Sequence, residues 1–508
     1  MFYCKKILTL FMIYNCLAWD NQVDNHFPGL ALSRAYFISP GGNDRNSGTL
    51  HAAFKTIERI NKLELHPGDS ILFEGDHQYA GSLNIRLYNS GDQLHPLLIS
   101  SYGKGIATLN SGNETGIFIY KSQWMKIINL KITGSGRKKG NLYSGLALQN
   151  SRHIYVDKIT VSGFQKSGLL IKSCEDISIT NIFAFENGAA GISVEGTYGI
   201  KNSNHQIYIG KCRVENNPGD PTNFTNQSGN GIVVANCTNV LIEYCTATNN
   251  GWDMPRKGNG PVGIWAYEAD SVVIQHCLSF RNKTSAGAAD GGGFDLDGGV
   301  THSTIQYCLS YENQGAGYCI FQYLYASPWH DNTFRYNISV NDGTISDAAA
   351  GLYIWNSSRD SNQFYNSFIY NNTIYNSKVS AISFSELSER KAFAFFNNIF
   401  VGKDNFIKGN SGTDTFLGND WWYSEAKNDG ELTIGEMRVL NKNPGFKDPD
   451  KINLTNASAL ENFESYKLSP ASPLRKDGID LFTLLAIKTG GKDFNYGVAP
   501  QTGIGASF

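Results

Sequence analysis

A short pattern of glycine and alternating apolar residues recurs along the chain. Each copy reads glycine, apolar, any residue, apolar, and a strand of this pattern places its two apolar side chains on one face. The interval between copies is 23 residues from Gly145 to Gly168 and 40 residues from Gly191 to Gly231. A constant core with a variable interval predicts a solenoid with loops inserted into some of its coils. The copies begin at Gly116, Gly145, Gly168, Gly191, Gly231, Gly263, Gly293, Gly317 and Gly351, with a weaker copy at Ala381.

A second repeated stretch follows each of these strands. The segments "VLIEYCTATNN", "VVIQHCLSFRN" and "STIQYCLSYEN" align without gaps. One position of this alignment is occupied by cysteine in four coils. In earlier coils the same position holds Ile159 and Ile182, and in later coils it holds asparagine. A slot that isoleucine and cysteine share is a buried one, so we predict a file of free thiols in the core rather than disulfides or metal ligands. The cysteines in this slot are Cys212, Cys245, Cys277 and Cys308.

One asparagine per coil follows five residues after this slot. Asparagine at a repeated turn tolerates left-handed backbone and allows side-chain amides to hydrogen-bond from coil to coil. Together with short alternating strands, this predicts an all-β protein, a right-handed parallel β-helix, the hand following from the usual chirality of parallel crossovers. The rival leucine-rich repeat lacks its leucine framework here. The asparagines are Asn187, Asn217, Asn250, Asn282 and Asn313.

The two ends of the chain complete the expected organisation. Lys5 and Lys6 precede an apolar run that ends at Ala18, which predicts a signal peptide over residues 1–18 and export to the periplasm or beyond. A helix from Phe54 to about Leu63 is expected to cap the solenoid. Residues 19–508 are expected to form one domain, with coils over about 95–405 and an irregular C-terminal segment over 406–508.

Charge and composition narrow the classes of partner. Lys and Arg number 43 against 45 Asp and Glu, a formal net charge of -2. A nucleic-acid partner favours a clearly basic chain, so we expect none. No later segment is apolar enough to predict a membrane span, and a monomer is expected.

The outward positions of the strands gather a candidate site. Side chains alternate along a strand and neighbouring coils lie about 4.8 Å apart, so Asp295 and Asp297 are expected to share one outward face with aromatic residues of adjacent coils. The pair can be an ordinary solvated strand face, and each aromatic can be an ordinary exposed residue. Five aromatics around one carboxylate pair favour a sugar-binding surface. They are Trp265, Tyr267, Phe321, Tyr353 and Trp355.

The inserted loops are expected to wall this face. The segments "GWDMPRKGNGPV" and "KTSAGAADGG" bring Arg256, Lys257, Lys283 and Asp290 to one side. The later insert "QYLYASPWHDNTFRY" is expected to bring His330 to the other side, although this histidine can be purely structural. Functional residues concentrate on such loops.

Two stretches carry a resemblance to known enzymes. The entry segment "AYFISPGGNDRNSGTLHAAFKTIERINKLELHPGDSILFEGDHQY" is similar to that of secreted bacterial β-helix carbohydrate enzymes, and "GGGFDLDGG" resembles strands of family-nine pectate lyases. The resemblance implies a β-helix whose aspartates bind calcium and whose lysine removes a proton beside a uronate carboxylate. Cys319 stands where that family has its lysine, so the catalytic base is not matched.

This resemblance and the basic loops favour β-elimination from a uronate. Ca²⁺ held by Asp290, Asp295 and Asp297 would neutralise the substrate carboxylate, or Arg256 or Lys283 would do so directly. Lys257 is the candidate base and Tyr267 or His330 the candidate acid. The expected function is a carbon–oxygen lyase acting on a uronate-containing polysaccharide or its oligosaccharides, of the polysaccharide lyase or uronate dehydratase type.

Two other functions remain open. Residues i and i+2 of a strand lie about 6.6 Å apart, so Asp295 and Asp297 can serve as the acid and base of an inverting glycoside hydrolase, which needs about 6.5–9.5 Å between carboxyl groups. The other function is a non-catalytic β-helix whose aromatics only hold a glycan. The carboxylate pair at the centre of the expected cleft counts against that function.

Overall fold

The computed structural model describes residues 33–87, 89–198, 200–258, 260–345, 350–385, 389–403, 406–409, 413–424, 440–447 and 449–508. The predicted signal peptide, residues 1–18, lies outside these ranges. The chain divides into two units, residues 1–32 and 33–508, and all the described residues belong to the second. Within the described ranges, no helix is long and apolar enough to cross a membrane.

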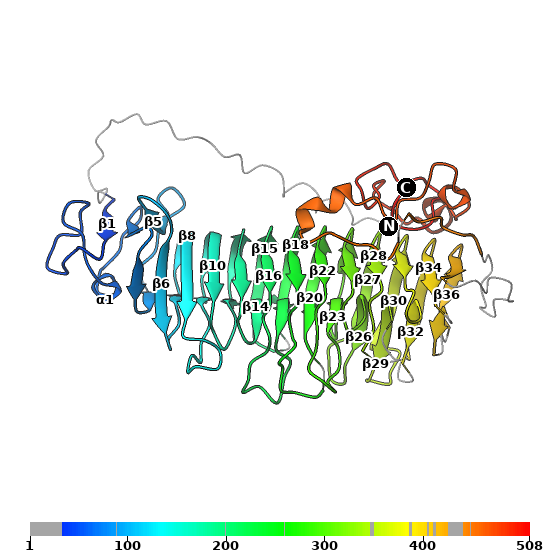
Figure 1. The fold of residues 1–508 in the computed structure, drawn as a ribbon, viewed down its shortest axis with the longest axis horizontal. Helices are drawn as coiled ribbons and strands as arrows, with labels where there is room; N and C mark the ends of the chain where they lie inside the picture. Colours follow the sequence, from blue (N-terminus) through cyan, green and yellow to red (C-terminus); the bar gives the residue numbers. More distant parts are fainter. Residues whose placement is uncertain are drawn as a thin grey trace. The chain divides into compact units, whose positions relative to one another are not determined.

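Two parallel sheets, one of 25 strands and one of 12, follow the axis of the solenoid (Figure 1). One coil runs through β20 (Val262–Tyr267), β21 (Asp270–Gln275) and β22 (Leu278–Phe280), and the next begins at β23 (Gly292–Leu296). β20 pairs in parallel with β23, β21 with β24 (Thr304–Gln306), and β22 with β25 (Leu309–Tyr311). The predicted all-β parallel β-helix is therefore confirmed.

The 12-stranded sheet receives one strand from each coil. Its other strands are β4 (Leu83–Arg86), β7 (Ile117–Tyr120), β9 (Leu146–Gln149), β11 (Leu169–Lys172), β14 (Ala190–Glu195), β17 (Asn230–Ala235), β26 (Tyr318–Gln322), β29 (Leu352–Asn356), β32 (Ile382–Phe384) and β35 (Ile407–Lys408). The apolar residues of the repeated pattern point into the core, because strand side chains alternate between the two faces.

The 25-stranded sheet wraps the rest of each coil. Its remaining strands are β1 (Ala35–Ile38), β2 (Ser70–Glu74), β3 (Gln78–Ala80), β5 (Leu97–Tyr102), β6 (Ala107–Gly112), β8 (Gln123–Gly134), β10 (Arg152–Ser162), β12 (Glu175–Thr180), β13 (Phe183–Phe185), β15 (Asn204–Gly210), β16 (Arg213–Glu215), β18 (Cys237–Glu243), β19 (Thr246–Thr248), β27 (Trp329–Arg335), β28 (Ile338–Val340), β30 (Phe364–Tyr370), β31 (Thr373–Tyr375), β33 (Lys391–Phe396), β34 (Ile399–Gly402), β36 (Thr415–Leu417) and β37 (Asp420–Tyr423).

The glycine that opens each repeat is required by close packing inside the coil. A Cβ atom on Gly263 would lie 2.0 Å from Ser279 Oγ, and one on Gly293 would lie 2.2 Å from Ser310 Oγ. Real Cβ atoms do not approach other atoms so closely, because protein interiors are already close-packed. The repeated glycine therefore marks a point where the 12-stranded sheet lies too close to neighbouring atoms of the solenoid for any larger residue.

The predicted cysteine file is confirmed. Cys212, Cys245, Cys277 and Cys308 are buried free thiols. The backbone N–H of Cys245 donates to Cys277 Sγ (3.4 Å), and that of Cys277 donates to Cys308 Sγ (3.5 Å). The file continues into asparagine, since Cys308 N–H donates to Asn337 Oδ1 (3.1 Å). The slot is buried in every coil, as the exchange of isoleucine for cysteine indicated.

The predicted asparagine ladder is confirmed as well. Asn187 Nδ2 donates to Asn217 Oδ1 (3.1 Å), Asn217 to Asn250 (2.9 Å), and Asn250 to Asn282 (2.9 Å). Each Oδ1 also accepts a hydrogen bond from the backbone N–H of the ladder asparagine in the preceding coil. Each asparagine therefore pairs buried donors of the asparagine before it. Asp342 ends this ladder by accepting from Asn313 Nδ2 (2.8 Å).

Both ends of the solenoid differ from the sequence expectation. The capping helix α1 spans only Ile57–Ile60, because Thr56 already acts as its N-cap by accepting from Arg59 N–H (3.2 Å), and Asn61 ends it. Ile57 and Ile60 are buried against the core, as a cap requires. Parallel pairing begins at β1 and continues to β37, beyond the predicted coils at about 95–405 in both directions.

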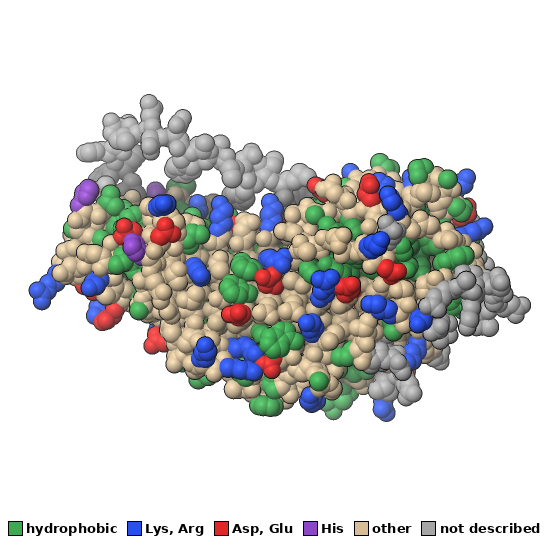
Figure 2. Space-filling model, viewed as in Figure 1, with side chains coloured by type: hydrophobic (Ala, Val, Ile, Leu, Met, Phe, Trp, Pro, Cys, Tyr) green, Lys and Arg blue, Asp and Glu red, His purple; other side chains and the backbone are tan. Residues whose placement is uncertain are grey.

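The C-terminal segment packs along the outside of the 25-stranded sheet (Figure 1). It contains α2 (Leu481–Leu485) and 3₁₀ turns at Ala457–Asn462 and Pro473–Arg475, and a further 3₁₀ turn lies at Lys201–Ser203. Leu460 and Leu474 form a second apolar core with outward residues of β22, β25 and β28, such as Leu309. On the face seen in Figure 2, basic and acidic side chains are interspersed, as a formal net charge of -2 leads one to expect.

Removing one rung of the asparagine ladder should destabilise the fold. Asn282→Ala removes the acceptor of Asn250 N–H and one of the two acceptors of Asn250 Nδ2, which keeps only the carbonyl of Val214 (3.3 Å). We expect a loss of about 2–4 kcal/mol in the free energy of unfolding, since each buried unpaired group costs about 1–3 kcal/mol. Urea denaturation checks this, with Lys131→Ala on the exposed face of β8 as the control. A loss no larger than that of the control would contradict the role of the ladder.

Candidate functional site

A cavity of about 530 Å³ opens on the outer face of the 12-stranded sheet. Strands β20, β23, β26 and β29 form its floor, and the inserted loops before β20 and β23 and after β26 and β29 form its walls. It is of the size that ligand pockets usually have. Its lining comprises Arg256, Gly260, Val262, Trp265, Ala289, Asp290, Asp295, Asp297, Phe321, Tyr323, Leu324, Tyr353, Trp355 and Ser357.

Asp295 lies at the centre of the cavity floor. In the parallel register it lies between Trp265 of the preceding coil and Cys319 of the next. Its side chain is buried, with 2% of the residue exposed, and its Oδ1 has no hydrogen-bond partner. Burial, together with the negative charges of Asp297 and Asp290, raises the pKa of Asp295 well above the usual range of a carboxyl group. This environment therefore favours the protonated form of Asp295 over its carboxylate.

Asp297 and Asp290 flank this buried carboxyl and are both half-buried. Burial raises the pKa of Asp297 to about 7, and the charge of Asp290 adds to this rise. A hydrogen bond that Asp297 Oδ1 accepts from Gly298 N–H (2.7 Å) lowers the pKa and offsets part of the rise. Burial also raises the pKa of Asp290, but Gly260 N–H, which donates to its Oδ2 (2.6 Å), and the nearby Arg256 favour the carboxylate. The cavity thus holds carboxyl groups in different environments.

The aromatic residues share the face that the sequence predicted, but they are less exposed than expected. Trp265 is 4% exposed, stacks on Tyr267 at 5.1 Å between ring centroids, and donates from Nε1 to Asn230 Oδ1 (3.0 Å). Phe321 is 6% exposed and meets Tyr353 edge-on at 5.2 Å. The expectation of an open exposed face is wrong, because the rings pack on one another and the loops cover them.

The second aromatic group lies on the other side of the aspartates. Trp355 meets Phe321 at 5.8 Å between ring centroids, nearly perpendicular, and both it and Tyr353 remain half-buried on the cavity wall. Tyr267 is not among the lining residues, although the charge of Asp297 contributes to raising its pKa, after burial and Glu195. The cavity therefore combines carboxyl groups with aromatic faces of adjacent coils.

Two lysines predicted at the site also do not line the cavity. Lys257 is exposed and its Nζ donates to the carbonyl of Ala286. Lys283 follows directly on Asn282 of the ladder and lines a separate depression beside Thr248. In each case the loop reaches the cavity, but the backbone turns the lysine away from it.

The expected position of His330 at the second wall is wrong. His330 belongs to β27 of the 25-stranded sheet, where its ring stacks on Tyr365 at 4.8 Å between centroids. The insert returns to the solenoid wall at Trp329, so only its first part, with Tyr323 and Leu324, borders the cavity.

Glu268 is a further acidic residue that the sequence reasoning missed. It is 1% exposed, accepts from Ser327 N–H at Oε1 (2.8 Å), and its Oε2 has no partner. Its charge contributes to the raised pKa of Asp297. The available signal was its place in "IWAYEAD", directly after the aromatic strand β20. Leu324 and Ser357 were also missed as lining residues, since loop residues carry no strand register.

One group of three metal-ligating side chains is close enough to hold an ion in the described part of the chain. It consists of His302, His330 and Asp331, whose ligand atoms all lie within 4.8 Å of one another. Asp290, Asp295 and Asp297 do not form such a group among the described residues, and calcium at these aspartates stays a prediction.

The fold and the cavity define a solenoid protein with an acidic, aromatic-lined cavity on one sheet. A family model described as the Pel9A-like right-handed β-helix region matches residues 36–386. The chain therefore belongs to this family, and both the predicted right-handed β-helix and the predicted resemblance are confirmed.

Individual relatives are more distant. The chain is 23% identical over 542 residues to a lacto-N-biosidase of Bifidobacterium longum subsp. longum, an alignment that covers 84% of this chain and 32% of that protein. The chain thus spans about a third of the length of this relative.

Two solved structures share the fold. The GH136 lacto-N-biosidase of Eubacterium ramulus matches with a TM-score of 0.53 and 18% identity, covering 74% of this chain and 68% of that chain. A mannuronic acid specific polysaccharide family 6 lyase from human gut microbiota matches with a TM-score of 0.53 and 14% identity, covering 81% of this chain and 92% of that chain. At these identities, the likeness concerns the fold alone.

The raised pKa of Asp297 predicts a pH-dependent stability. A carboxyl group whose pKa rises from 3.8 to about 7 on folding stabilises the fold fully below about pH 4, and this contribution is lost as the pH rises through about 7. Asp297→Asn should therefore raise the free energy of unfolding at pH 8 by about 2–4 kcal/mol relative to the native protein. At pH 4 the difference should nearly vanish. Urea denaturation at both pH values checks this, and an equal effect at both would show that charge is not the cause.

Proposed function

We propose that the chain is a glycoside hydrolase that binds a neutral glycan in this cavity and cleaves it with Asp297 and Asp290. The observation that carries the proposal is a pair of carboxyl groups in one cavity with different neighbours. Burial raises the pKa of Asp297 to about 7, whereas Arg256 partly offsets the rise that burial causes in the pKa of Asp290. Hydrolysis of a glycosidic bond needs one carboxyl group that gives a proton and one that stays ionised. Pairs of carboxyl groups with different environments supply both.

Asp297 is the proton donor in this proposal. With a pKa of about 7, it carries its proton at slightly acidic pH and still gives it up readily. The proton passes to the glycosidic oxygen as the bond from that oxygen to the anomeric carbon breaks. The leaving sugar departs with a new hydroxyl group, and Asp297 becomes a carboxylate.

Asp290 is the ionised partner. It accepts from Gly260 N–H (2.6 Å), and Arg256 lies near enough to favour its charge. As a base it takes a proton from the water that attacks the anomeric carbon. As a nucleophile it forms an ester with that carbon, and water, deprotonated by the Asp297 carboxylate, then cleaves the ester and restores both residues. The anomeric configuration of the first product distinguishes the two, since direct attack of water inverts it.

Asp295 serves in this proposal as a neutral hydrogen-bond donor rather than as the base. Its raised pKa favours the protonated form, the residue lines the cavity, and its buried Oδ1 has no hydrogen-bond partner. A protonated carboxyl group of this kind can hold a substrate hydroxyl or the carboxylate of Asp297. This assignment replaces the Asp295/Asp297 acid and base pair expected from strand spacing.

The charge of the lining supports a neutral sugar as the substrate. Three carboxyl groups face the cavity, and Arg256 is the one basic side chain among its described lining residues. A uronate carboxylate would be repelled unless a metal neutralised it. The faces of Trp265 and Trp355 provide apolar walls against which a sugar ring can lie. Two lacto-N-biosidases among the similar proteins also support hydrolysis.

β-Elimination from a uronate is the second candidate function. The mannuronic acid specific lyase that shares the fold favours it, and Arg256 could pair with a substrate carboxylate. Lys257, the base proposed from the sequence, would need its loop to turn, because its Nζ now donates to Ala286. Calcium at Asp290, Asp295 and Asp297 would be required to offset their charge.

Substitution of the two proposed catalytic residues tests hydrolysis. Asp297→Asn and Asp290→Asn should each lower kcat about 10²–10⁴-fold, the usual effect of removing an acid or base, with the fold retained. The assay is release of reducing sugar from a panel of neutral oligosaccharides that includes lacto-N-biosides. Asp176→Asn, an exposed carboxylate of β12 on the other sheet, is the control and should keep its activity.

The same panel, extended with uronate polymers, separates hydrolysis from elimination. Hydrolysis gives saturated products whose formation is insensitive to chelator. A rise in near-ultraviolet absorbance from an unsaturated product, lost with chelator and restored by Ca²⁺, would favour elimination instead. Full activity of both aspartate variants on a confirmed substrate would show that the site lies elsewhere.

A further inference from the structure

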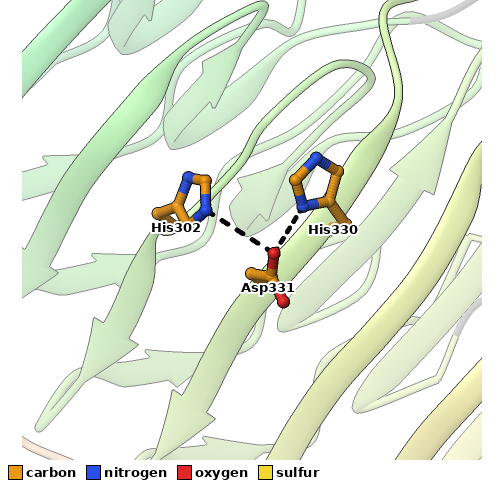
Figure 3. Close-up of side chains that lie close together, drawn as sticks. All are labelled: His302, His330 and Asp331. Carbon is orange, nitrogen blue, oxygen red and sulfur yellow. Dashed lines mark hydrogen bonds and ion pairs between the residues drawn. The ribbon is translucent and has the colours of Figure 1, made fainter. Parts of the chain in front are cut away.

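Two histidines and an aspartate converge on the outer surface of the 25-stranded sheet (Figure 3). His302 lies in the turn before β24, and His330 and Asp331 lie in β27 of the next coil. The cavity residues belong to the 12-stranded sheet and its loops, so this group is a separate feature of the fold.

The spacing of these side chains fits a small metal ion. His302 Nε2 lies 3.5 Å from Asp331 Oδ2, and His330 Nδ1 lies 2.6 Å from the same oxygen. Ligands at about 2.0–2.1 Å from a tetrahedral zinc ion are about 3.3 Å apart. The first separation already matches this value, and the second reaches it if Asp331 moves by less than 1 Å.

Neighbouring residues hold the imidazole of His302 in the orientation that a metal ligand needs. Asp270 Oδ1 lies 2.7 Å from His302 Nδ1 and also accepts from Thr301 Oγ1 (2.6 Å). A carboxylate at Nδ1 fixes the proton there and leaves the lone pair of Nε2 directed at Asp331. This carboxylate–histidine arrangement is the usual support of a histidine ligand in metalloproteins.

The other two ligands are supported as well. The ring of His330 stacks on Tyr365 at 4.8 Å with an angle of 13° between the planes. Asp331 Oδ1 accepts from Asn366 Nδ2, which leaves Oδ2 for the two histidines. Lys201 contacts Thr301 (3.3 Å), so the surroundings hold two carboxylates against one ammonium group and favour a cation.

The parallel register brings these residues together. A bridge pairs Thr301 with His330, so His302 and Asp331 occupy the same turn position in adjacent coils. Both have left-handed backbone, with φ of 49° and 58°. An ion at this place would join neighbouring coils at one edge of the turn.

We propose that His302, His330 and Asp331 bind a divalent transition-metal ion of the zinc type, with the remaining position open to water. Imidazole nitrogen and carboxylate oxygen are ligands that zinc accepts, whereas calcium takes oxygen ligands almost alone. The ion links two coils of the solenoid and stabilises their stacking, because binding to the folded state alone favours that state.

The chain offers a matched control in its own turn ladder. His153 also has left-handed backbone, pairs through Nδ1 with Asp176 (2.7 Å) and stacks on an aromatic ring, Trp124 (4.0 Å). It has the histidine–carboxylate pair and the stacking but is not part of a group of three ligands at metal-binding distance. His153→Ala therefore removes a surface histidine of the same kind outside the proposed site.

The test is a titration of the chelator-treated, purified protein with Co²⁺ and then Zn²⁺. One equivalent of Co²⁺ should give the visible bands of a four-coordinate ion without near-ultraviolet thiolate bands, and Zn²⁺ should displace it and raise Tm. His302→Ala, its more conservative form His302→Gln, and His330→Ala should each weaken binding at least tenfold, and Asp270→Asn should weaken it about 10–100-fold. His153→Ala should bind as the native protein does.

Three results would overturn the proposal. They are the absence of stoichiometric binding, unchanged binding by the His302 variants, and an equal loss in His153→Ala, which would indicate adventitious surface binding. The Tm of each variant without metal shows whether it folds, and His302→Gln provides the answer if the alanine variants do not.

Discussion

In-register parallel pairing is the constraint on which the rest of this structure depends. Each coil lays its residues directly beside the corresponding residues of the preceding coil, so a side chain is repeated or opposed at intervals of about 4.8 Å. Cys277 therefore meets Cys308, and Asn250 meets Asn282. A slip of one residue would turn these groups to the opposite face of the wall and leave buried polar groups unpaired.

The same register assembles the cavity and determines its electrostatics. It sets Asp295 beside Trp265 and Cys319, and the inserted loops then cover this stretch of the sheet. Burial among aromatic rings raises the pKa of the carboxyl groups, whereas an open strand face would have left them ionised. The loops thus convert a surface pair of aspartates into groups that can exchange protons near neutral pH.

The sequence predicted the features that repeat. The exchange of Ile159 and Ile182 for cysteine at one slot marked a buried file, and the five-residue offset marked the asparagine ladder. Alternation also predicted that Asp295 and Trp265 face the same side. These predictions succeeded because a solenoid repeats its geometry, so that each coil constrains the next.

The predictions that were wrong concern loops, because the repeat does not determine the conformation of the inserted loops. Alternation along the strand predicts that the side chain of Trp265 points outward, but it does not predict which loops cover that side chain. The burial of Trp265 therefore could not be predicted from the strand pattern. Lys257 turns away because its Nζ meets Ala286, a contact between two inserts. His330 was assigned to an insert although β27 begins at Trp329, one residue before it. Glu268 was overlooked because it lies in the turn after β20 rather than on its outward face.

We propose that the covered aspartates on the 12-stranded sheet form the reaction centre of a glycoside hydrolase. The most direct measurement is a crystal structure of Asp297→Asn with an oligosaccharide bound. We expect a glycosidic oxygen within about 3 Å of the residue 297 side chain, a sugar ring against Trp265 or Trp355, and the anomeric carbon facing Asp290. A sugar bound elsewhere on the solenoid, or with its glycosidic oxygen far from residue 297, would contradict it.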